Sequence, residues 1–172
     1  MPVRHNIDSS FSQLQNFLSI QVPQIVLQTA QESFKQNFNK KSFDGNLWPE
    51  TKKPVKKGTL MVRSRALLNS VRGTVVSSSL VRMIAGSPEV PYARIHNEGG
   101  KISRAARSET FTRNRAKAGK RKGQFRKGTS DGQGFSFKAY SYNMPQRQFM
   151  GPSAQLSKEI KDNIAAAFKN LK

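Results

Sequence analysis

The residues that could carry out chemistry are few in this sequence, and their spacing does not bring them together. Its two histidines stand far apart, His5 in a polar N-terminal segment and His96 ahead of a Gly-Gly pair. There is no cysteine, no His-Glu-x-x-His motif and no Asp-rich calcium loop, so the common metal-ligand patterns are missing. The ten acidic residues are scattered and form no pair of the kind that glycosidases and metal-dependent nucleases use. We therefore predict no catalytic, cofactor-binding or metal-binding residue and no enzyme activity, with His96 as a hydrogen-bonded structural histidine.

Charge is the strongest compositional feature. The 172 residues contain 30 Lys and Arg against 10 Asp and Glu, a formal net charge of +20. Such a chain is drawn to polyanions, whether nucleic acid, an acidic protein or a membrane surface, and charge alone does not choose among them. The sequence has no apolar run of about 18 residues, so we predict no membrane span and no membrane partner. The polar N-terminus has no apolar region typical of a secretory signal.

Half of this net charge lies in residues 101–128, which hold eleven cations and one acid, Glu109. Too few apolar side chains are present there to offset the entropy cost of folding, so we predict a flexible insertion at 101–134, a long loop or arm between two strands. It could follow a phosphate backbone while Phe111 and Phe125 stack on bases, grip an acidic neighbouring subunit, or remain solvated. The predicted contacts to a polyanion or acidic partner are Lys101, Arg104, Arg107, Arg113, Arg115, Lys117, Lys120, Arg121, Lys122, Arg126 and Lys127.

Apolar residues at helical spacing mark the first forty residues. They predict one helix at about 9–20 and a second at about 23–39. Pro23 cannot donate its backbone N–H, so it should kink or split this region. In the turn-rich stretch that follows, the Asp44-Gly45 pair suits a tight turn, and Trp48, the only tryptophan, is expected to plug the edge of the core.

Short helices and strands alternate in the rest of the chain. We predict a short helix at 65–69, strands at 71–77 and 80–85 that form a hairpin or meander, and a strand at 135–142. A last helix with a single apolar stripe should begin near residues 152–153, because proline suits the first turn of a helix.

Two motifs and several smaller blocks carry a family resemblance. The central motif is Tyr92-Ala93-Arg94-Ile95-His96-Asn97-Glu98-Gly99-Gly100, and the closing motif is Met144-Pro145-Gln146-Arg147-Gln148-Phe149-Met150-Gly151-Pro152-Ser153. Before them come Phe43, Gly45 and Trp48-Pro49, then Leu60-Met61-Val62, then Leu67, Leu68 and Ser70. In this order the pieces resemble the phage virion morphogenesis family, the tail-completion proteins of Mu-like contractile phages. Ser64-Arg65 stands where that family often has Thr-Gly, and the basic insertion is longer than expected.

The resemblance implies a single neck or tail-completion domain over residues 1–172. Its fold would be α+β, with a small, mainly antiparallel sheet, N-terminal helices and a C-terminal helix. The implied function is that of a structural virion protein at the head–tail junction or tail top of a tailed bacteriophage. It would assemble as a ring, six-fold by the usual symmetry of tails, without catalysis. Other neck, connector or tail-terminator proteins would be its partners, the virion its location and the host cytoplasm its site of assembly. The alternative is a sequence-independent nucleic-acid-binding protein that contacts DNA through the basic insertion.

A ring needs two different complementary patches on each subunit, because its interfaces are heterologous. The two motifs suit this task, since both are irregular, flank the insertion and contain aromatic or Arg side chains of the kind that dominate interface energetics. Equally, Pro145, Phe149 and Gly151 could serve only to set the corner between a strand and the last helix. The predicted residues of this assembly interface or structural motif are Trp48, Tyr92, His96, Gly99, Gly100, Pro145, Arg147, Phe149 and Gly151.

Overall fold

The computed structural model describes residues 3–51, 55, 57–109, 118–120, 122 and 135–171. The chain divides into two compact units. The first, which we call the body, comprises Met1–Gly100 and Pro145–Lys172. The second, which we call the arm, is Lys101–Met144. Helices and short strands are both present, so the predicted α+β class is confirmed. Within the described residues the strands form four separate two-stranded sheets rather than one small sheet.

The N-terminal helices of the body are nearly continuous. Helix α1 (Val3–Asn16) leads into a π-helical turn, η1 (Phe17–Gln21), and then into α2 (Val22–Lys40). The predicted second helix at about 23–39 corresponds to α2, and the kink or split expected at Pro23 takes the form of this π-helical turn rather than a gap between two helices. In η1 the Val22 N–H donates to the Phe17 carbonyl, five residues earlier, and Pro23 then sits in the first turn of α2, where a missing N–H is tolerated. Helix α1 also begins six residues before the predicted start.

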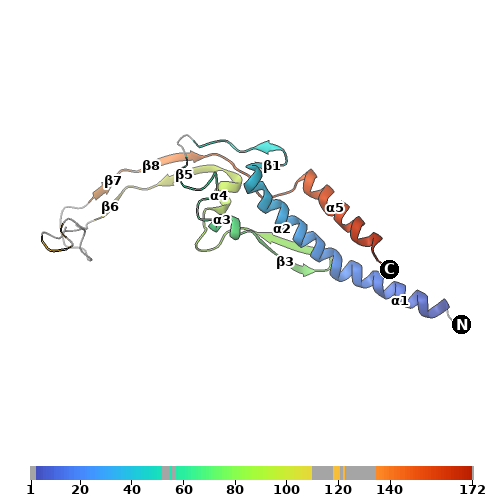
Figure 1. Cartoon of the computed structure of the whole chain (residues 1–172). Coiled ribbons are helices and arrows are strands. Elements are labelled where there is room, and N and C mark those ends of the chain that lie inside the picture. The colour runs from blue at the N-terminus through green and yellow to red at the C-terminus, as the bar shows by residue number, and fades with distance from the viewer. Residues whose placement is uncertain are drawn as a thin grey trace. The chain divides into compact units, whose positions relative to one another are not determined.

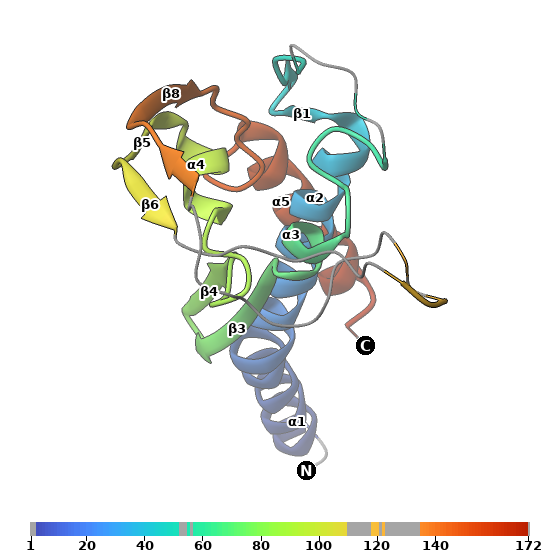
Figure 2. The ribbon, with the colours of Figure 1, turned by 90° about the vertical axis from the view of Figure 1, so that its left-hand side faces the viewer.

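Helix α2 forms the centre of the body. Its buried face carries Ala30, Phe34 and Phe38, which are spaced four residues apart and so lie on one side of the helix. Figure 1 shows helix α5 (Ala154–Lys169) along one side of α2 and the hairpin that begins with β3 along the other. Figure 2 shows the same body from a second direction, with α2 again between these elements. The core is therefore built around one helix rather than on a sheet.

A tight turn connects α2 to the buried tryptophan. Strands β1 (Ser42–Phe43) and β2 (Asn46–Leu47) pair antiparallel, and Asp44 and Gly45 between them have φ of 48° and 84°. Two positive φ values are what a two-residue hairpin loop with the hand of the strands requires. Trp48 follows, buried, with its ring edge-on to Phe38 at 5.6 Å between centroids. The predicted turn and the predicted role of Trp48 are both confirmed.

The remaining elements of the body follow the sequence prediction closely. They are helix α3 (Ala66–Asn69), the antiparallel hairpin of β3 (Arg72–Ser77) and β4 (Leu80–Ile84), and α5. Helix α4 (Ala93–Glu98) also forms, in a segment where the sequence predicted no helix. Helix α5 begins after Ser153, whose hydroxyl accepts a hydrogen bond from the Leu156 N–H at 3.1 Å. This N-cap explains why the helix starts there and not at Pro152.

The arm contains more regular structure than expected. Strand β5 (Gly100–Arg104) pairs with β8 (Tyr140–Met144), and β6 (Arg107–Glu109) pairs antiparallel with β7 (Phe135–Phe137). The prediction of a loop is thus wrong for residues 101–109, because backbone pairing with a distant segment needs no buried side chains. The predicted strand at 135–142 is interrupted after Phe137. Residues 110–117, 121 and 123–134 of the predicted insertion lie outside the described part of the chain.

Candidate assembly interface

The central and closing motifs, far apart in the sequence, are joined by hydrogen bonds in the body. The backbone N–H of Arg147 donates to the carbonyl of His96 at 2.8 Å. The side-chain oxygen of Asn97 accepts from the N–H groups of Phe149 and Met150, each at 3.0 Å. We call this joined region, Tyr92–Gly100 with Pro145–Ser153, the motif junction. The sequence resemblance in these two motifs is therefore carried by one structural unit.

Glycine is required where the two halves of the junction approach most closely. Gly99 has φ of 73° and ψ of −173°, a conformation that is open in practice only to glycine. A Cβ atom there would lie 2.9 Å from the backbone nitrogen of Gln146. Gly100 and Gly151 also have positive φ, at 132° and 155°. Backbone geometry thus explains the predicted glycine positions, and Pro145 lies exposed at the start of the closing segment.

Phe149 and Trp48 anchor the junction inside the body. Phe149 is fully buried, and its ring centroid lies 5.0 Å from that of Phe38. Its carbonyl accepts from the Asn37 side chain at 3.1 Å, and the Trp48 indole N–H donates to the Gln148 carbonyl at 2.6 Å. Neither aromatic ring is presented to a neighbouring molecule, so in this fold both hold the closing segment onto α2.

Arg147 is buried with its positive charge. Only 5% of it is exposed; its Nε donates to the Pro49 carbonyl at 2.8 Å and its Nη2 to the Glu50 carbonyl at 3.3 Å. No carboxylate among the described residues pairs with it. Burial lowers the pKa of the guanidinium, although an arginine remains protonated. The junction therefore contains an uncompensated positive charge, which is an unfavourable arrangement unless an anion approaches it.

His96, which lies beside Arg147, contains a polar atom that lacks a hydrogen-bond partner. Its Nδ1 is buried and has no hydrogen-bond partner. The prediction of a hydrogen-bonded structural histidine is therefore wrong for this atom. Burial, and then the nearby charge of Arg147, lower the pKa of the imidazole below its usual 6.5. The ring is consequently neutral at pH 7, and the edge of the Tyr92 ring faces it at 5.7 Å between centroids.

These groups line a concave site of about 310 Å³, which we call the basic pocket. His96, Arg147 and Tyr92 form one wall, and the segment from Leu60 to Leu67 forms another. Arg63 and Arg65 on that segment are exposed, while no acidic side chain lines the pocket. Among the described residues, the site combines the positive charge of three arginines with no acid, so its chemistry suits a carboxylate or another small anion. Sequence reasoning missed Arg63 and Arg65; the departure at Ser64-Arg65 from the family's usual Thr-Gly drew attention to Arg65 alone, and only as a possible change in the turn.

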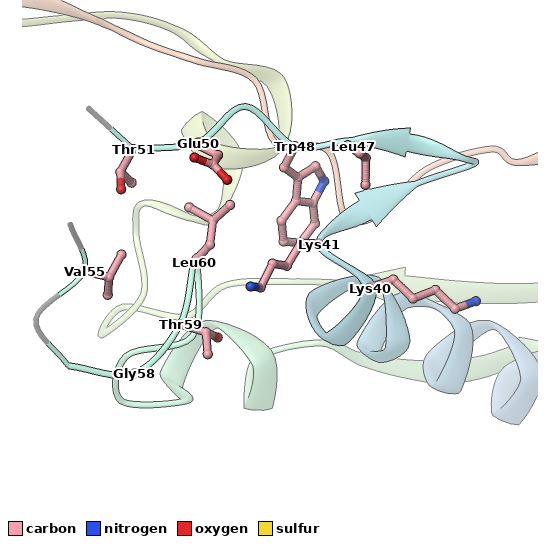
Figure 3. Close-up of a pocket in the computed structure, with 10 residues that line it drawn as sticks. All are labelled: Lys40, Lys41, Leu47, Trp48, Glu50, Thr51, Val55, Gly58, Thr59 and Leu60. Atoms are coloured by element: carbon pink, nitrogen blue, oxygen red, sulfur yellow. The ribbon is translucent and has the colours of Figure 1, made fainter. Parts of the chain in front are cut away.

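A larger hollow of about 700 Å³ lies beside Trp48 and has a different character. Figure 3 shows the side chains of Trp48, Leu60 and Lys41 close together in it. The indole N–H of Trp48 is already used within the body, and Glu50 is the one carboxylate among the described lining residues. Among the described residues that line it, no nucleophile, base and orienting group come together.

The arm presents exposed cations and aromatic rings. Tyr140 and Tyr142, two residues apart on β8, have nearly parallel rings 6.2 Å apart. The guanidinium carbon of Arg107 lies 4.9 Å from the centre of the Phe137 ring. Such a surface can stack on bases or on other side chains, and the alternation of residues 135–142 was its only sequence signal.

The predicted polyanion contacts are only partly described. Five have exposed described positions, namely Lys101, Arg104, Arg107, Lys120 and Lys122. The other six predicted contacts lie outside the described residues, namely Arg113, Arg115, Lys117, Arg121, Arg126 and Lys127. Phe111 and Phe125 lie outside them as well.

Searches for other kinds of site gave negative results over the described residues. No group of three or more His, Cys, Asp or Glu side chains that could hold a metal ion occurs in that part of the chain. No helix there is long and apolar enough to cross a membrane.

Comparison with known proteins supports the resemblance seen in the two motifs. The family model described as the phage virion morphogenesis family matches residues 18–169, which include α2, the motif junction and α5. Comparisons with curated proteins and with solved structures gave no match. Because the family match covers most of the chain, including both halves of the junction, this protein belongs to the phage virion morphogenesis family.

Proposed function

We propose that this protein is a structural subunit at the head–tail junction or tail top of a tailed bacteriophage, where it assembles as a ring that completes or joins the tail. The observation that carries this proposal is the family match over residues 18–169, which indicates a role in building the virion. The geometry of the body agrees with such a role, because its best-formed features are surfaces rather than a reaction site.

Exposed apolar side chains provide one such surface. Phe11 is 67% exposed and Leu18 55%, and their seven-residue spacing places them on the same side of the helical run of α1 and η1. Large apolar side chains exposed together are a common mark of protein–protein contact. A subunit that is covered by neighbours in the assembled particle would bury them there. This helical region is therefore a natural contact with a second copy or with another neck protein.

The experiment is to locate the chain in particles and to remove it. Phage carrying a stop codon in the gene should produce filled heads and separate tails, and supplying the protein should restore joined particles. Labelled antibody should mark the neck or tail top in electron micrographs of purified virions. Normal infectious particles without the chain, or its absence from purified virions, would refute the proposal.

Ring formation is tested separately on the purified protein. A six-fold ring of the 19.3 kDa chain has a mass of six times that value, about 116 kDa, which light scattering after size-exclusion chromatography can measure. Another closed ring would correct only the copy number. Within the virion, the protein would contact connector or tail-terminator proteins.

A second function, sequence-independent nucleic-acid binding, is favoured by the aromatic and cationic surface of the arm. If the arm contacts channel DNA, the isolated chain should bind DNA of any sequence, with an affinity that falls steeply as salt rises. Reversing the charges of Lys120, Arg121 and Lys122 should then weaken binding. Particles that join normally with these changes would show that the arm is dispensable for assembly.

A further inference from the structure

The basic pocket is lined by cations, and no described carboxylate lies among its lining residues to balance them. It is lined by a buried arginine without a carboxylate partner, Arg147, by two exposed arginines, Arg63 and Arg65, and by His96. Among the described residues, none of the acids of the body lines it. Its volume of about 310 Å³ has room for one or two side chains. A carboxylate entering it would gain charge-assisted hydrogen bonds that the isolated subunit cannot supply.

The body has a complementary acidic surface elsewhere. Glu32 of α2 and Glu159 and Asp162 of α5 line a shallow site between these two helices, and no cation lines it. Three of the ten acids of the chain thus gather in one place. Helices α2 and α5 are tied together there by a hydrogen bond from the Asn163 side chain to Thr29 at 2.9 Å. We call this surface the acidic patch; Lys158 and Lys161 of α5 are not among the residues that line it.

We propose that the basic pocket of one subunit receives the carboxylates of the acidic patch of a second copy of this chain. The two surfaces share no residue, the pocket being built from α3, α4 and the segments beside them and the patch from α2 and α5. Contacts between two different patches are heterologous, which is what repeats a subunit around a ring. The inference rests on the proposed function in that respect, and it names the residues that would form the ring contact.

The shape of the pocket favours a protein carboxylate over the phosphates of DNA. Arg147 is buried, so a group must enter the pocket on a side chain to reach it. Phosphates on a duplex lie on a convex backbone, where flat or grooved basic surfaces fit them better than a pocket of this size. Arg63 and Arg65 at the surface would guide the approaching carboxylates.

The experiment exchanges the charges of the two surfaces in the full-length protein. The first variant is Arg63→Glu with Arg65→Glu, and the second is Glu159→Lys with Asp162→Lys. Each alone opposes like charges across the contact, so self-association measured by sedimentation velocity should weaken by about tenfold or more. Mixing the two variants should restore it, because every contact in an alternating ring then joins opposite charges.

Matched controls carry charge changes of the same sign away from both surfaces. Arg72→Glu with Arg82→Glu alters the exposed side of the β3–β4 hairpin, and Glu89→Lys reverses an exposed acid outside both surfaces. Circular dichroism of each variant checks that it folds. The controls should associate like the wild-type protein, which separates the local contact from the effect of net charge.

Several outcomes would overturn the inference. Unchanged association of either exchanged variant would do so, as would a mixture that remains dissociated. A variant at Arg63 and Arg65 that loses only DNA binding would assign the pocket to nucleic acid instead. A wild-type chain that stays monomeric at all concentrations would also refute it. Incorporation into virions is measured separately, so a chain that is found in the neck but does not use this contact would leave the proposed function standing.

Discussion

The backbone N–H of Arg147 donates to the carbonyl of His96 at 2.8 Å, and this bond joins two motifs that the sequence separates by about fifty residues. It places the buried guanidinium of Arg147 next to the half-buried imidazole of His96. Together these two side chains line the basic pocket, where no described carboxylate pairs with the guanidinium. The same relationship explains why the arm can be inserted here. Its first and last residues, Lys101 and Met144, directly follow and precede the two halves of the junction.

Replacement of Gly99 tests the close approach of the two motifs. Gly99→Ala should destabilise the body by about 2–4 kcal/mol, because alanine is strained at this φ and ψ and its Cβ would contact the backbone of Gln146. Urea unfolding followed by circular dichroism measures the change. Gly45→Ala is the matched control, since Gly45 also has positive φ but nothing lies within 4 Å of the added Cβ. Equal losses in the two variants would show that the close approach contributes nothing.

Asn97 tests the hydrogen bonds that hold the closing segment. Asn97→Ala removes the acceptor of the Phe149 and Met150 N–H groups, and leaving partly buried donors unpaired costs about 1–3 kcal/mol each. We expect a lower urea midpoint with an unchanged slope. Asn97→Asp keeps an oxygen at the same position and should retain most of the stability. If the alanine variant were as stable as wild type, water or a rearranged backbone would have to replace these bonds.

The lowered pKa of His96 leads us to predict a specific pH dependence of the free energy of unfolding. The folded pKa is lowered, so the unfolded chain takes up a proton at a higher pH than the folded chain does. The contribution of the neutral imidazole is therefore complete above pH 6.5, and it decreases as pH falls below 6.5 towards the folded pKa. His96→Gln should flatten the stability profile in this range.

Nuclear magnetic resonance measures the histidine directly. In a His5→Gln background the remaining imidazole signals belong to His96 alone, and their midpoint should lie below 6.5. A midpoint at or above 6.5 would contradict the burial of the ring beside Arg147. Opening the body with urea should return the midpoint to the ordinary value for histidine.

The hydrogen bonds to Asp44 at the start of α5 lead us to predict a second loss of stability, at a lower pH than that of His96. The Asp44 carboxylate accepts from the Ser153 hydroxyl at 2.8 Å and from the Gln155 N–H at 3.3 Å, and these bonds lower its pKa below 3.8. The stability that they add is present above pH 3.8 and is lost as pH falls through the lowered pKa. Asp44→Asn should therefore reduce the difference in stability between neutral and acidic solution, which acid-unfolding curves measure.

Ser153 itself is tested by removal of its hydroxyl. Ser153→Ala should destabilise the protein by about 1 kcal/mol, because the Leu156 N–H loses its cap and Asp44 loses its first hydrogen-bond donor. Ser157→Ala is the control, since that hydroxyl donates only to the Ser153 carbonyl within the same helix turn. Thermal unfolding of the two variants side by side decides the matter. A loss as large in the Ser157 variant would remove the case for a cap.

Local sequence determined most of the elements in the body. Apolar residues at helical spacing gave α2 and α5, the Asp44-Gly45 pair gave the turn before Trp48, and β-branched residues gave the β3–β4 hairpin. These features depend on short-range rules, namely the period of side chains along an element and the φ values that each residue tolerates. The two motifs were also visible as a family resemblance, since it needs only the order of residues.

Tertiary structure decided the rest, because the deciding interactions join distant segments. The π-helical turn before Pro23 and the strands at 101–109 depend on which backbone partners are available, and no local pattern reports that. The burial of Arg147, the unpartnered nitrogen of His96 and the presence of Arg63 and Arg65 around them follow from the packing of α3, α4 and the closing segment. A sequence fixes how many charges a chain carries, but whether a charge meets a partner or is left in a pocket depends on which residues folding brings within a few ångströms of it.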